Sequence, residues 1–254
     1  VGQSELAFRM MCKKYGTHLG YTPMFWSDRF ASDPEYRAEN WRACKEEGPV
    51  VVQFCGNDAD VLLRAAKFVE HECDVVDLNL GCPQDYAKEN FIGSFLADDW
   101  QRVKHIVSTL SAGLSVPVSC KIRKLFSIER TVEFARMLQD AGCKMICMHG
   151  RTRQQIRSGR ADWDVVRAVK VAAGLPVIAN GNIHSLADVT ACMEHTGADA
   201  CMSGEALLEN PALFAGRTDI PRCDLAREYL SFAAQYSAPF KFARQHVGNI
   251  LMCY

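Results

Sequence analysis

Short apolar runs rich in β-branched residues recur along the chain, and amphipathic stretches with helical spacing lie between most of them. The seven apolar runs are Leu19–Met24, Val50–Phe54, Val75–Leu80, Val118–Ile122, Met145–Met148, Val177–Ala179 and Ala200–Met202. The amphipathic stretches are Asp58–Glu72, Trp100–Ala112, Ile128–Ala141, Asp164–Ala173 and Ser185–Thr196. Strands that alternate with helices are typical of a parallel sheet covered by helices. The pattern therefore predicts an α/β protein built from repeated strand–helix units.

A predicted helix at Ser4–Tyr15 opens the chain, with Ser4 as its expected N-cap and no strand before it. A TIM (β/α)8 barrel whose first strand would precede Val1 explains both this opening helix and the seven strands. An open doubly wound sheet is the alternative. Such a sheet more often carries a glycine-rich phosphate loop after its first strand, and the early strands here carry none. We therefore expect a TIM barrel lacking its first strand.

The strand–helix rhythm changes after Pro211. Asp224–Tyr236 and Phe240–Leu251 have helical spacing, and no strand pattern separates them. We therefore expect residues 1–215 to form the barrel and residues 216–254 to begin a helical domain.

Composition narrows the class of protein. Of 254 residues, 48% are hydrophobic, and the net charge is −1, so the chain is an ordinary globular protein and not a polycation. The twelve cysteines contain no CxxC pair, and several lie inside apolar runs, which indicates reduced thiols and an intracellular location. We expect the cytoplasm, with the nucleus as an alternative, and a monomer.

Several kinds of segment or site are not expected. No apolar run approaches the roughly 18–20 residues that a membrane span needs, and the first residues do not resemble a signal peptide. The seven histidines show no ligand spacing, so no metal site is predicted.

Polar residues come late in the predicted strands, after the apolar ones. One such residue is usually structural, but six consecutive strands share the feature. In a barrel these strand ends converge on the C-terminal face, where active sites lie. The polar residues at or near the strand ends are Gln53, Asp77, Asn79, Lys121, His149, Asn180, Asn182 and Ser203.

The last two strand ends suggest a ligand. Ala179–Asn182 and Ser203–Glu205 are small, glycine-containing turns that lead into helices, where backbone N–H groups can hold a phosphate. Lys121 across the mouth would suit a flavin ring, which gains negative charge on reduction. A Schiff-base lysine is the alternative for this residue, and spacing alone does not separate the two.

Two further segments point to chemistry on the same face. Cys82 lies just beyond the strand Val75–Leu80, between the loop formers Gly81 and Pro83. A cysteine thiol is mostly protonated at neutral pH and can act as a general acid. The loop Arg151–Arg160 carries four arginines and no acid, which is suited to a phosphate backbone.

Together these segments resemble the tRNA-dihydrouridine synthase family. The matching segments are Ser4–Arg9, Asp77–Gln84, Cys120–Arg123, His149–Arg153, Ala161–Trp163, Ala179–Ile183 and Asn210–Phe214. Gln84 and Gly93–Leu96 look most like the eukaryotic branch that acts on the sixteenth and seventeenth nucleotides of tRNA. The pair Glu89–Asn90 departs from the family, which usually has a basic residue and glycine there.

The resemblance implies FMN, a helical RNA-binding domain, tRNA as substrate and NAD(P)H as reductant. It implies that Cys82 is the proton donor, and that Asn79, Arg151 and Arg153 face the substrate. The residues implied to contact FMN are Gln53, Lys121, His149, Asn180, Gly181, Asn182, Gly204 and Glu205. The alternatives are an FMN barrel that acts on a free pyrimidine, and a non-catalytic RNA-binding relative.

Overall fold

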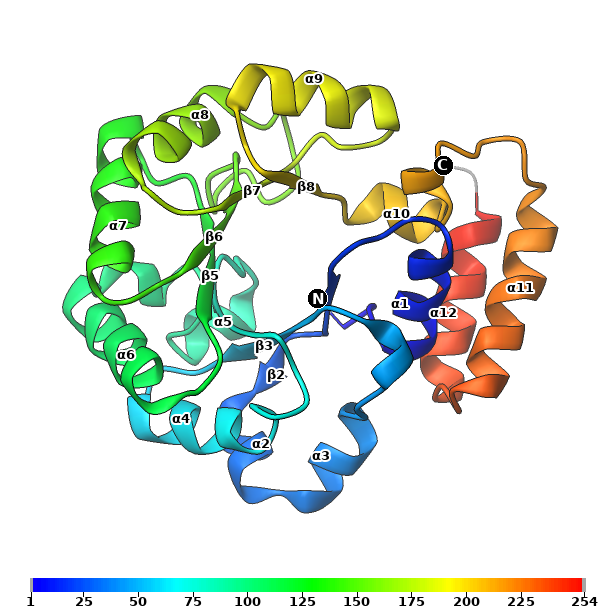
Figure 1. Cartoon of the computed structure of the whole chain (residues 1–254), viewed down its shortest axis with the longest axis horizontal. Coiled ribbons are helices and arrows are strands. Elements are labelled where there is room, and N and C mark those ends of the chain that lie inside the picture. Colours follow the sequence, from blue (N-terminus) through cyan, green and yellow to red (C-terminus); the bar gives the residue numbers. More distant parts are fainter. Residues whose placement is uncertain (1, 253–254) are drawn as a thin grey trace.

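The computed structural model describes residues 2–252 and shows a curled parallel sheet with helices around its outer side (Figure 1). The strands are β1 (Gly20–Tyr21), β2 (Phe25–Trp26), β3 (Val50–Cys55), β4 (Val75–Leu80), β5 (Val118–Arg123), β6 (Met145–His149), β7 (Val177–Asn180) and β8 (Ala200–Met202). Their order is β1-β3-β4-β5-β6-β7-β8, with β2 also paired to β3, and every pairing is parallel. The sheet is a TIM-like half-barrel, as expected from the sequence.

The first predicted strand is interrupted. Instead of one strand over Leu19–Met24, β1 and β2 each pair with β3, and the segment between them holds one more residue than the facing part of β3. Pro23 lies in this bulge and has no N–H to donate to a ladder. The Thr22 hydroxyl accepts a hydrogen bond from the Gln53 N–H at 3.0 Å. The bulge therefore helps to fix a predicted site residue.

Four of the five amphipathic stretches form helices within one residue of the predicted bounds, whereas the helix predicted over Asp58–Glu72 ends at Lys67. The helices are α1 (Leu6–Lys14), α2 (Ser27–Ser32), α3 (Pro34–Asn40), α4 (Ala59–Lys67), α5 (Asp85–Glu89), α6 (Trp100–Gly113), α7 (Ile128–Asp140), α8 (Trp163–Ala172), α9 (Leu186–Thr196), α10 (Glu205–Glu209), α11 (Arg222–Gln235) and α12 (Phe240–Leu251). Short 3-10 turns lie at Lys45–Glu47, Leu96–Asp98 and Leu213–Ala215. Asp58 and Ser185 accept backbone hydrogen bonds as N-caps of α4 and α9. The expected cap at Ser4 is wrong, because Glu5 occupies the N-cap position of α1 and makes no side-chain cap bond.

The main core lies between the sheet and the helices that cover it. Phe54 and Leu78 on the strands and Leu62, Ile106 and Phe134 on the helices are each at most 1% exposed. Burying a side chain of this size contributes about 1.5–3 kcal/mol relative to leaving it in water. This packing holds the strands in register and so holds the residues at their ends.

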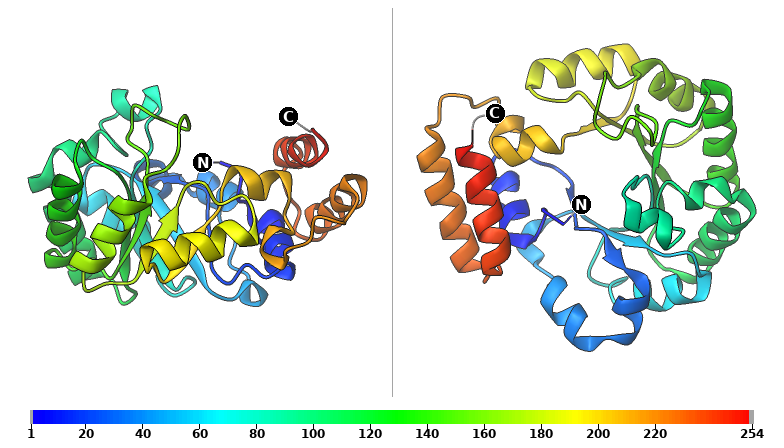
Figure 2. Two further views of the ribbon diagram at one scale, coloured as in Figure 1. Left: turned by 90° about the horizontal axis from the view of Figure 1, so that it is seen from above. Right: turned by 180° about the vertical axis from the view of Figure 1, so that it is seen from behind.

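A second core joins the two ends of the described chain. Phe8 and Met11 of α1 pack with Leu225, Tyr229 and Ile250 of α11 and α12. Figure 2 shows these three helices grouped outside the ring of strand–helix units. The predicted division at residues 215/216 stays a prediction, and the first helix shares its apolar face with the segment beyond that division.

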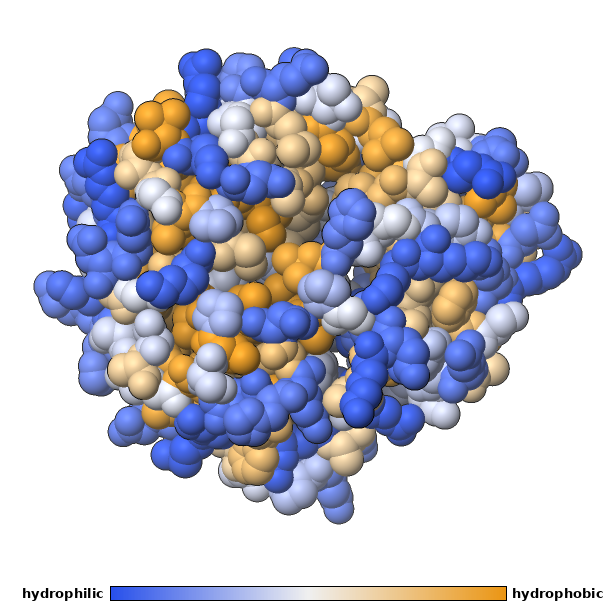
Figure 3. Space-filling model, viewed as in Figure 1, coloured by the Kyte–Doolittle hydropathy of each residue, from blue (hydrophilic) through white to orange (hydrophobic). Residues whose placement is uncertain are grey.

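The surface separates into two kinds of region. Figure 3 shows hydrophobic residues within the ring of helices and mostly hydrophilic residues around its outside. Among residues 2–252, every helix is too short or too polar to cross a membrane.

Candidate functional site

The carboxyl ends of the central strands bring the predicted polar residues to one edge of the sheet. Asn79 on β4 lies beside Lys121 on β5. Arg123 on β5 lies beside His149 on β6, which lies beside Asn180 on β7. The expected convergence of polar strand ends is therefore confirmed for these strands.

A chain of buried hydrogen bonds orients two of these residues. Gln53 Nε2 donates to Asp77 Oδ2 at 2.9 Å, and Asn79 Nδ2 donates to Gln53 Oε1 at 2.8 Å. Ser119 Oγ donates to the other oxygen of Asp77 at 2.6 Å. Because a carboxylate only accepts, the bond to Asp77 fixes which way the Gln53 amide points, and the Gln53 oxygen then fixes the Asn79 amide. Asp77 therefore sets the orientation of Gln53, which in turn holds Asn79.

Asp77 is 0% exposed, and its hydrogen-bond partners are neutral. Burial raises the pKa of Asp77 to about 6, against the hydrogen bonds from Ser119 and Gln53 and the charge of Lys121, which lower it. A carboxylate held this way remains ionised at neutral pH but lies close to its protonation point.

The loop after β4 is held at both its N–H groups and its carbonyls. Asn79 Oδ1 accepts from the N–H groups of Gly81 and Cys82, at 3.1 and 2.9 Å. Arg123 Nε donates to the carbonyl of Gly81 at 2.6 Å. Gly93 has φ +60°, and a Cβ there would lie 2.7 Å from the Cys82 carbonyl oxygen, so only glycine allows this approach. Cys82, which is 3% exposed, is therefore fixed at the site edge.

Lys121 faces the next strands across the mouth. Its Nζ donates to Asn180 Oδ1 at 3.1 Å, and Asn180 Nδ2 donates to the carbonyl of Met202 at 2.9 Å. Asn180 therefore links the cation on β5 to the end of β8. An ammonium held by a neutral amide is available to an anionic ligand.

His149 is neutral in this setting. Burial, with the charges of Lys121, Arg123 and Arg151, lowers the pKa of His149 to about 2. Arg151 NH1 lies 3.3 Å from Nε2 of His149, and a guanidinium only donates, so Nε2 is the acceptor and Nδ1 carries the hydrogen. The ring therefore presents one N–H without adding charge.

The turn after β7 depends on unusual backbone geometry. Gly181 has φ +111°, and a Cβ there would lie 2.7 Å from the Cβ of Ala161 and 3.0 Å from Cδ2 of His149. Asn182 has φ +62°, and its Oδ1 accepts from Arg151 NH2 at 2.7 Å and from the Ala161 N–H at 2.9 Å. The turn is thus fastened to the arginine loop.

The turn after β8 is more open. A Cβ at Gly204 would meet no atom within 4 Å. The Glu205 carboxylate pairs with Arg157 at 2.7 Å, and both side chains are exposed. A phosphate at this turn would therefore meet the backbone of Glu205 and not its carboxylate.

The arginine loop is divided between internal and exposed roles. Arg153 NH1 donates to Asp98 at 2.6 Å and to the carbonyl of Ser94 at 3.0 Å, with its side chain 31% exposed. Arg157 is 69% exposed. Arg151 is held by His149, Asn182 and the Gly159 carbonyl. Arg157 is thus the freer of the two outer cations for an external partner.

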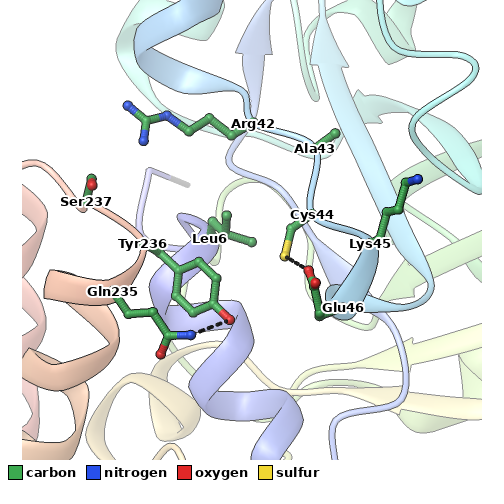
Figure 4. A pocket seen from close by; sticks show the side chains of 9 residues that line it. All are labelled: Leu6, Arg42, Ala43, Cys44, Lys45, Glu46, Gln235, Tyr236 and Ser237. Carbon is green, nitrogen blue, oxygen red and sulfur yellow. Dashed lines mark hydrogen bonds between the residues drawn. The ribbon is translucent and has the colours of Figure 1, made fainter.

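Two cavities of about 330 and 480 Å³ lie away from the strand ends, between the start of α1, the segment before β3 and the α11–α12 turn. Figure 4 shows the smaller one, where Tyr236 and Gln235 face Cys44 and Glu46. Neither of these two cavities is lined by a predicted site residue.

The structure adds Arg123 and Tyr86 to the predicted site and gives a role to Asp77. Asp77 orients Gln53, Arg123 braces the loop of Cys82, and the Tyr86 hydroxyl lies 3.1 Å from Cys82 Sγ. The alternation of Asp77 with Asn79 already placed Asp77 on the site face in the sequence. The contacts of Arg123 and Tyr86 depend on loop geometry that strand spacing does not contain. No group of three or more metal-ligating side chains occurs among residues 2–252.

The chain matches known proteins over its whole length. The dihydrouridine synthase family model matches residues 1–254. The "tRNA-dihydrouridine(16/17) synthase [NAD(P)(+)]-like" protein of Mus musculus is 44% identical over 254 residues, covering 98% of this chain and 53% of that protein. The "tRNA-dihydrouridine(16/17) synthase [NAD(P)(+)]" of Saccharomyces cerevisiae is 43% identical, covering 92% of this chain and 59% of that protein. The chain thus spans a little over half the length of these relatives.

One solved structure supports the fold alone. It is described as DHODH in complex with ferulenol from Eimeria tenella, and it superposes with a TM-score of 0.53 at 13% identity over 83% of this chain and 62% of that one. The sequence resemblance is therefore confirmed: this chain belongs to the dihydrouridine synthase family.

Proposed function

We propose that this chain carries the catalytic part of an enzyme that reduces uridine to 5,6-dihydrouridine in the D loop of tRNA, at positions 16 and 17, with FMN as cofactor and NAD(P)H as reductant. One observation carries the proposal. Cys82 is held by Asn79 at the same sheet edge as Lys121, in a member of this family. The names of the two relatives give the tRNA position and the NAD(P) reductant.

The residues present fit a flavin phosphate and ring. Lys121 supplies a cation at the mouth, and His149 supplies a neutral N–H beside it. Gly181 and Gly204 leave the backbone turns after β7 and β8 without side chains, which suits a phosphate. The residues that would hold FMN are Gln53, Lys121, His149, Asn180, Gly181, Asn182, Gly204 and Glu205. When bound, reduced FMN supplies the hydride that the uracil ring requires.

The chain's own residues handle the proton and the base. Cys82 donates its thiol proton to C5 of uracil, and the electron pair of the S–H bond stays on sulfur. Asn79 and Arg151 face the base, and Arg153 fixes the loop beside it. The base must leave its stack to reach the site, which costs a few kcal/mol and less in a flexible loop. The exposed arginines favour RNA over a free pyrimidine.

The test starts from cells that lack the gene and returns to them either the wild-type gene or the Cys82→Ala variant. The tRNA of both strains is then isolated. Dihydrouridine at positions 16 and 17, measured by mass spectrometry, returns only with wild type under this proposal. Assays of the FMN-loaded protein on tRNA and on free uridine separate the RNA enzyme from a free-pyrimidine enzyme. A wild type that binds RNA but forms no dihydrouridine would be a non-catalytic relative.

A further inference from the structure

The thiol of Cys82 has a side-chain partner to which no role has been given. Tyr86 is the second residue of α5, two positions after the N-cap Gln84, and its hydroxyl lies 3.1 Å from Cys82 Sγ. Its ring packs against Trp26, with centroids 5.8 Å apart and planes at 49°. The hydroxyl is therefore held in place from one side by an aromatic wall and from the other by the loop of Cys82.

The apolar surroundings of Cys82 make a hydrogen-bond partner important for loss of the thiol proton. The thiol packs in an apolar cluster with Met24, Cys55, Ala87 and Ile92. A thiol that gives up its proton there leaves a thiolate, and a buried charge without a hydrogen bond is costly. A donor next to the sulfur therefore decides how easily the proton leaves.

Other groups near the sulfur are less suited to this task. Three titratable groups interact with Cys82: Tyr86 of α5, Cys55 of β3 and Arg123 of β5. Arg123 Nε and NH1 already donate to backbone carbonyls of the loop of Cys82 and of the arginine loop, so these N–H groups are not directed at the sulfur. Cys55 is a buried thiol, and an S–H group is only a weak hydrogen-bond donor. Tyr86 makes the one side-chain hydrogen bond to Sγ found in this part of the chain.

We propose that Tyr86 is a positioning residue that holds the Cys82 thiol and donates its O–H to the sulfur while that thiol loses its proton to uracil C5. The inference rests on the proposed function. In the step, the S–H bond breaks and its electron pair stays on sulfur as a thiolate, while the C5=C6 π pair of the uracil, whose C6 takes the hydride, forms the C5–H bond. Tyr86 keeps its own proton throughout, and the thiolate recovers a proton from water after product leaves.

Tyr86→Phe isolates the hydrogen bond, because it keeps the ring that packs on Trp26. The first measurement is the rate at which iodoacetamide alkylates Cys82 in the FMN-loaded protein across a range of pH. Mass spectrometry resolves Cys82 from Cys73 in the same tryptic peptide, so Cys73 is an internal reference. The midpoint is the pH at which the alkylation rate of a cysteine reaches half its maximum. Loss of a hydrogen bond to the thiolate moves the Cys82 midpoint upward by about one pH unit and leaves the alkylation rates of Cys73 at each pH unchanged.

Tyr15→Phe is the matched control. The hydroxyl of Tyr15, the C-cap residue of α1, also donates to an anion, the Glu228 carboxylate at 2.6 Å, but away from the site. The Tyr15→Phe variant is expected to keep the Cys82 midpoint of wild type. If the reagent does not reach Cys82, the ultraviolet absorbance of the thiolate, taken as wild type minus Cys82→Ala, gives the same midpoint. An identical midpoint in Tyr86→Phe and wild type overturns the proposal.

Turnover separates this inference from the function on which it rests. With tRNA as substrate, Tyr86→Phe lowers kcat roughly tenfold and leaves KM for tRNA unchanged. An unchanged kcat in an active enzyme contradicts the role of Tyr86. If wild type forms no dihydrouridine while the alkylation midpoint still moves, the proposed function fails and the contact between Tyr86 and Cys82 stands.

Discussion

Two buried carboxylates, one in the sheet and one at the junction of the helices, show how partners decide what an acid does. Asp77 is bonded by Ser119 and Gln53, both neutral, and burial raises its pKa to about 6. Glu5 is bonded by Tyr229 at 2.7 Å and by His246 at 2.8 Å. Burial alone would raise the pKa of Glu5, but the hydrogen bonds and the charge of His246 outweigh it and lower the pKa.

The difference follows from what each region must do. Asp77 directs Gln53 toward Asn79, at the cost of keeping a charge among neutral partners. Glu5 joins α1 to both helices that follow the sheet, because Tyr229 belongs to α11 and His246 to α12. A carboxylate that bonds to side chains of two different helices suits a junction whose task is to hold those helices together. A carboxylate that only accepts hydrogen bonds suits a site in which the side-chain amides of Gln53 and Asn79 must point in fixed directions.

The largest expected effect belongs to the site. Cys82→Ala removes the proposed acid and lowers dihydrouridine formation by about 10²–10⁴-fold. The Asp77 network is left intact, so the protein keeps its flavin colour and its stability. The matched control, Cys73→Ser, removes a half-buried thiol outside the site and keeps wild-type turnover. Turnover by Cys82→Ala at the wild-type rate would remove this residue from the mechanism.

The junction is expected to respond in stability. Glu5→Ala leaves the Tyr229 hydroxyl and His246 Nε2 without their partner, which destabilises the fold by about 3 kcal/mol. Urea denaturation at neutral pH measures the loss. Glu5→Gln, which keeps an acceptor for one of the two donors, loses less. A Glu5→Ala protein as stable as wild type would contradict a structural role for this pair.

The two carboxylates also differ in the sign of their pH dependence. Since the folded pKa of Glu5 is lowered, its contribution to stability is present above the unfolded pKa and is lost as pH falls through the folded one. Since the folded pKa of Asp77 is raised, its contribution is present below the unfolded pKa and is lost as pH rises through about 6.

Asp77→Asn tests the second sign. The free energy of unfolding of wild type falls by about 2–3 kcal/mol through this group as pH rises from about 4 to 6, and the Asp77→Asn protein does not show this fall. Unfolding free energies measured across this window in both proteins give the difference. Parallel pH curves for the two proteins would mean that Asp77 does not titrate in the folded state as described.

The smallest effect is expected at the exposed edge of the site. Arg157 pairs with Glu205 in water, so Arg157→Ala changes stability by less than about 1 kcal/mol. It weakens tRNA binding and reduces the slope of binding against salt by about one. Arg153→Ala also disturbs the contact with Asp98, so it costs more stability. Salt slopes that equal the wild-type slope would exclude Arg157 as a phosphate contact.

Much of the fold was predictable, because the spacing of apolar residues indicates the helices and strands, and the polar residues mark where the strands end. The helix Phe240–Leu251 has the predicted bounds, and Asn79, Lys121, His149 and Asn180 meet as parallel strands require. The bulge before Phe25 was not predictable, since Pro23 reads equally well as a strand edge. The hydrogen bond of Glu5 with His246 joins residues 241 positions apart, and local spacing contains no such information. The role of each site residue toward a ligand stays a prediction.

The central claim is that the strand ends around Lys121 hold FMN. The direct measurement is a fluorescence titration of FMN with the flavin-free protein, comparing wild type with Lys121→Met and with Lys104→Met, a change at an exposed lysine of α6. We expect one FMN site in wild type, an affinity at least about tenfold weaker in Lys121→Met, and no change in Lys104→Met. A wild type that does not bind FMN, or a Lys121→Met protein that binds it equally well, would contradict the account.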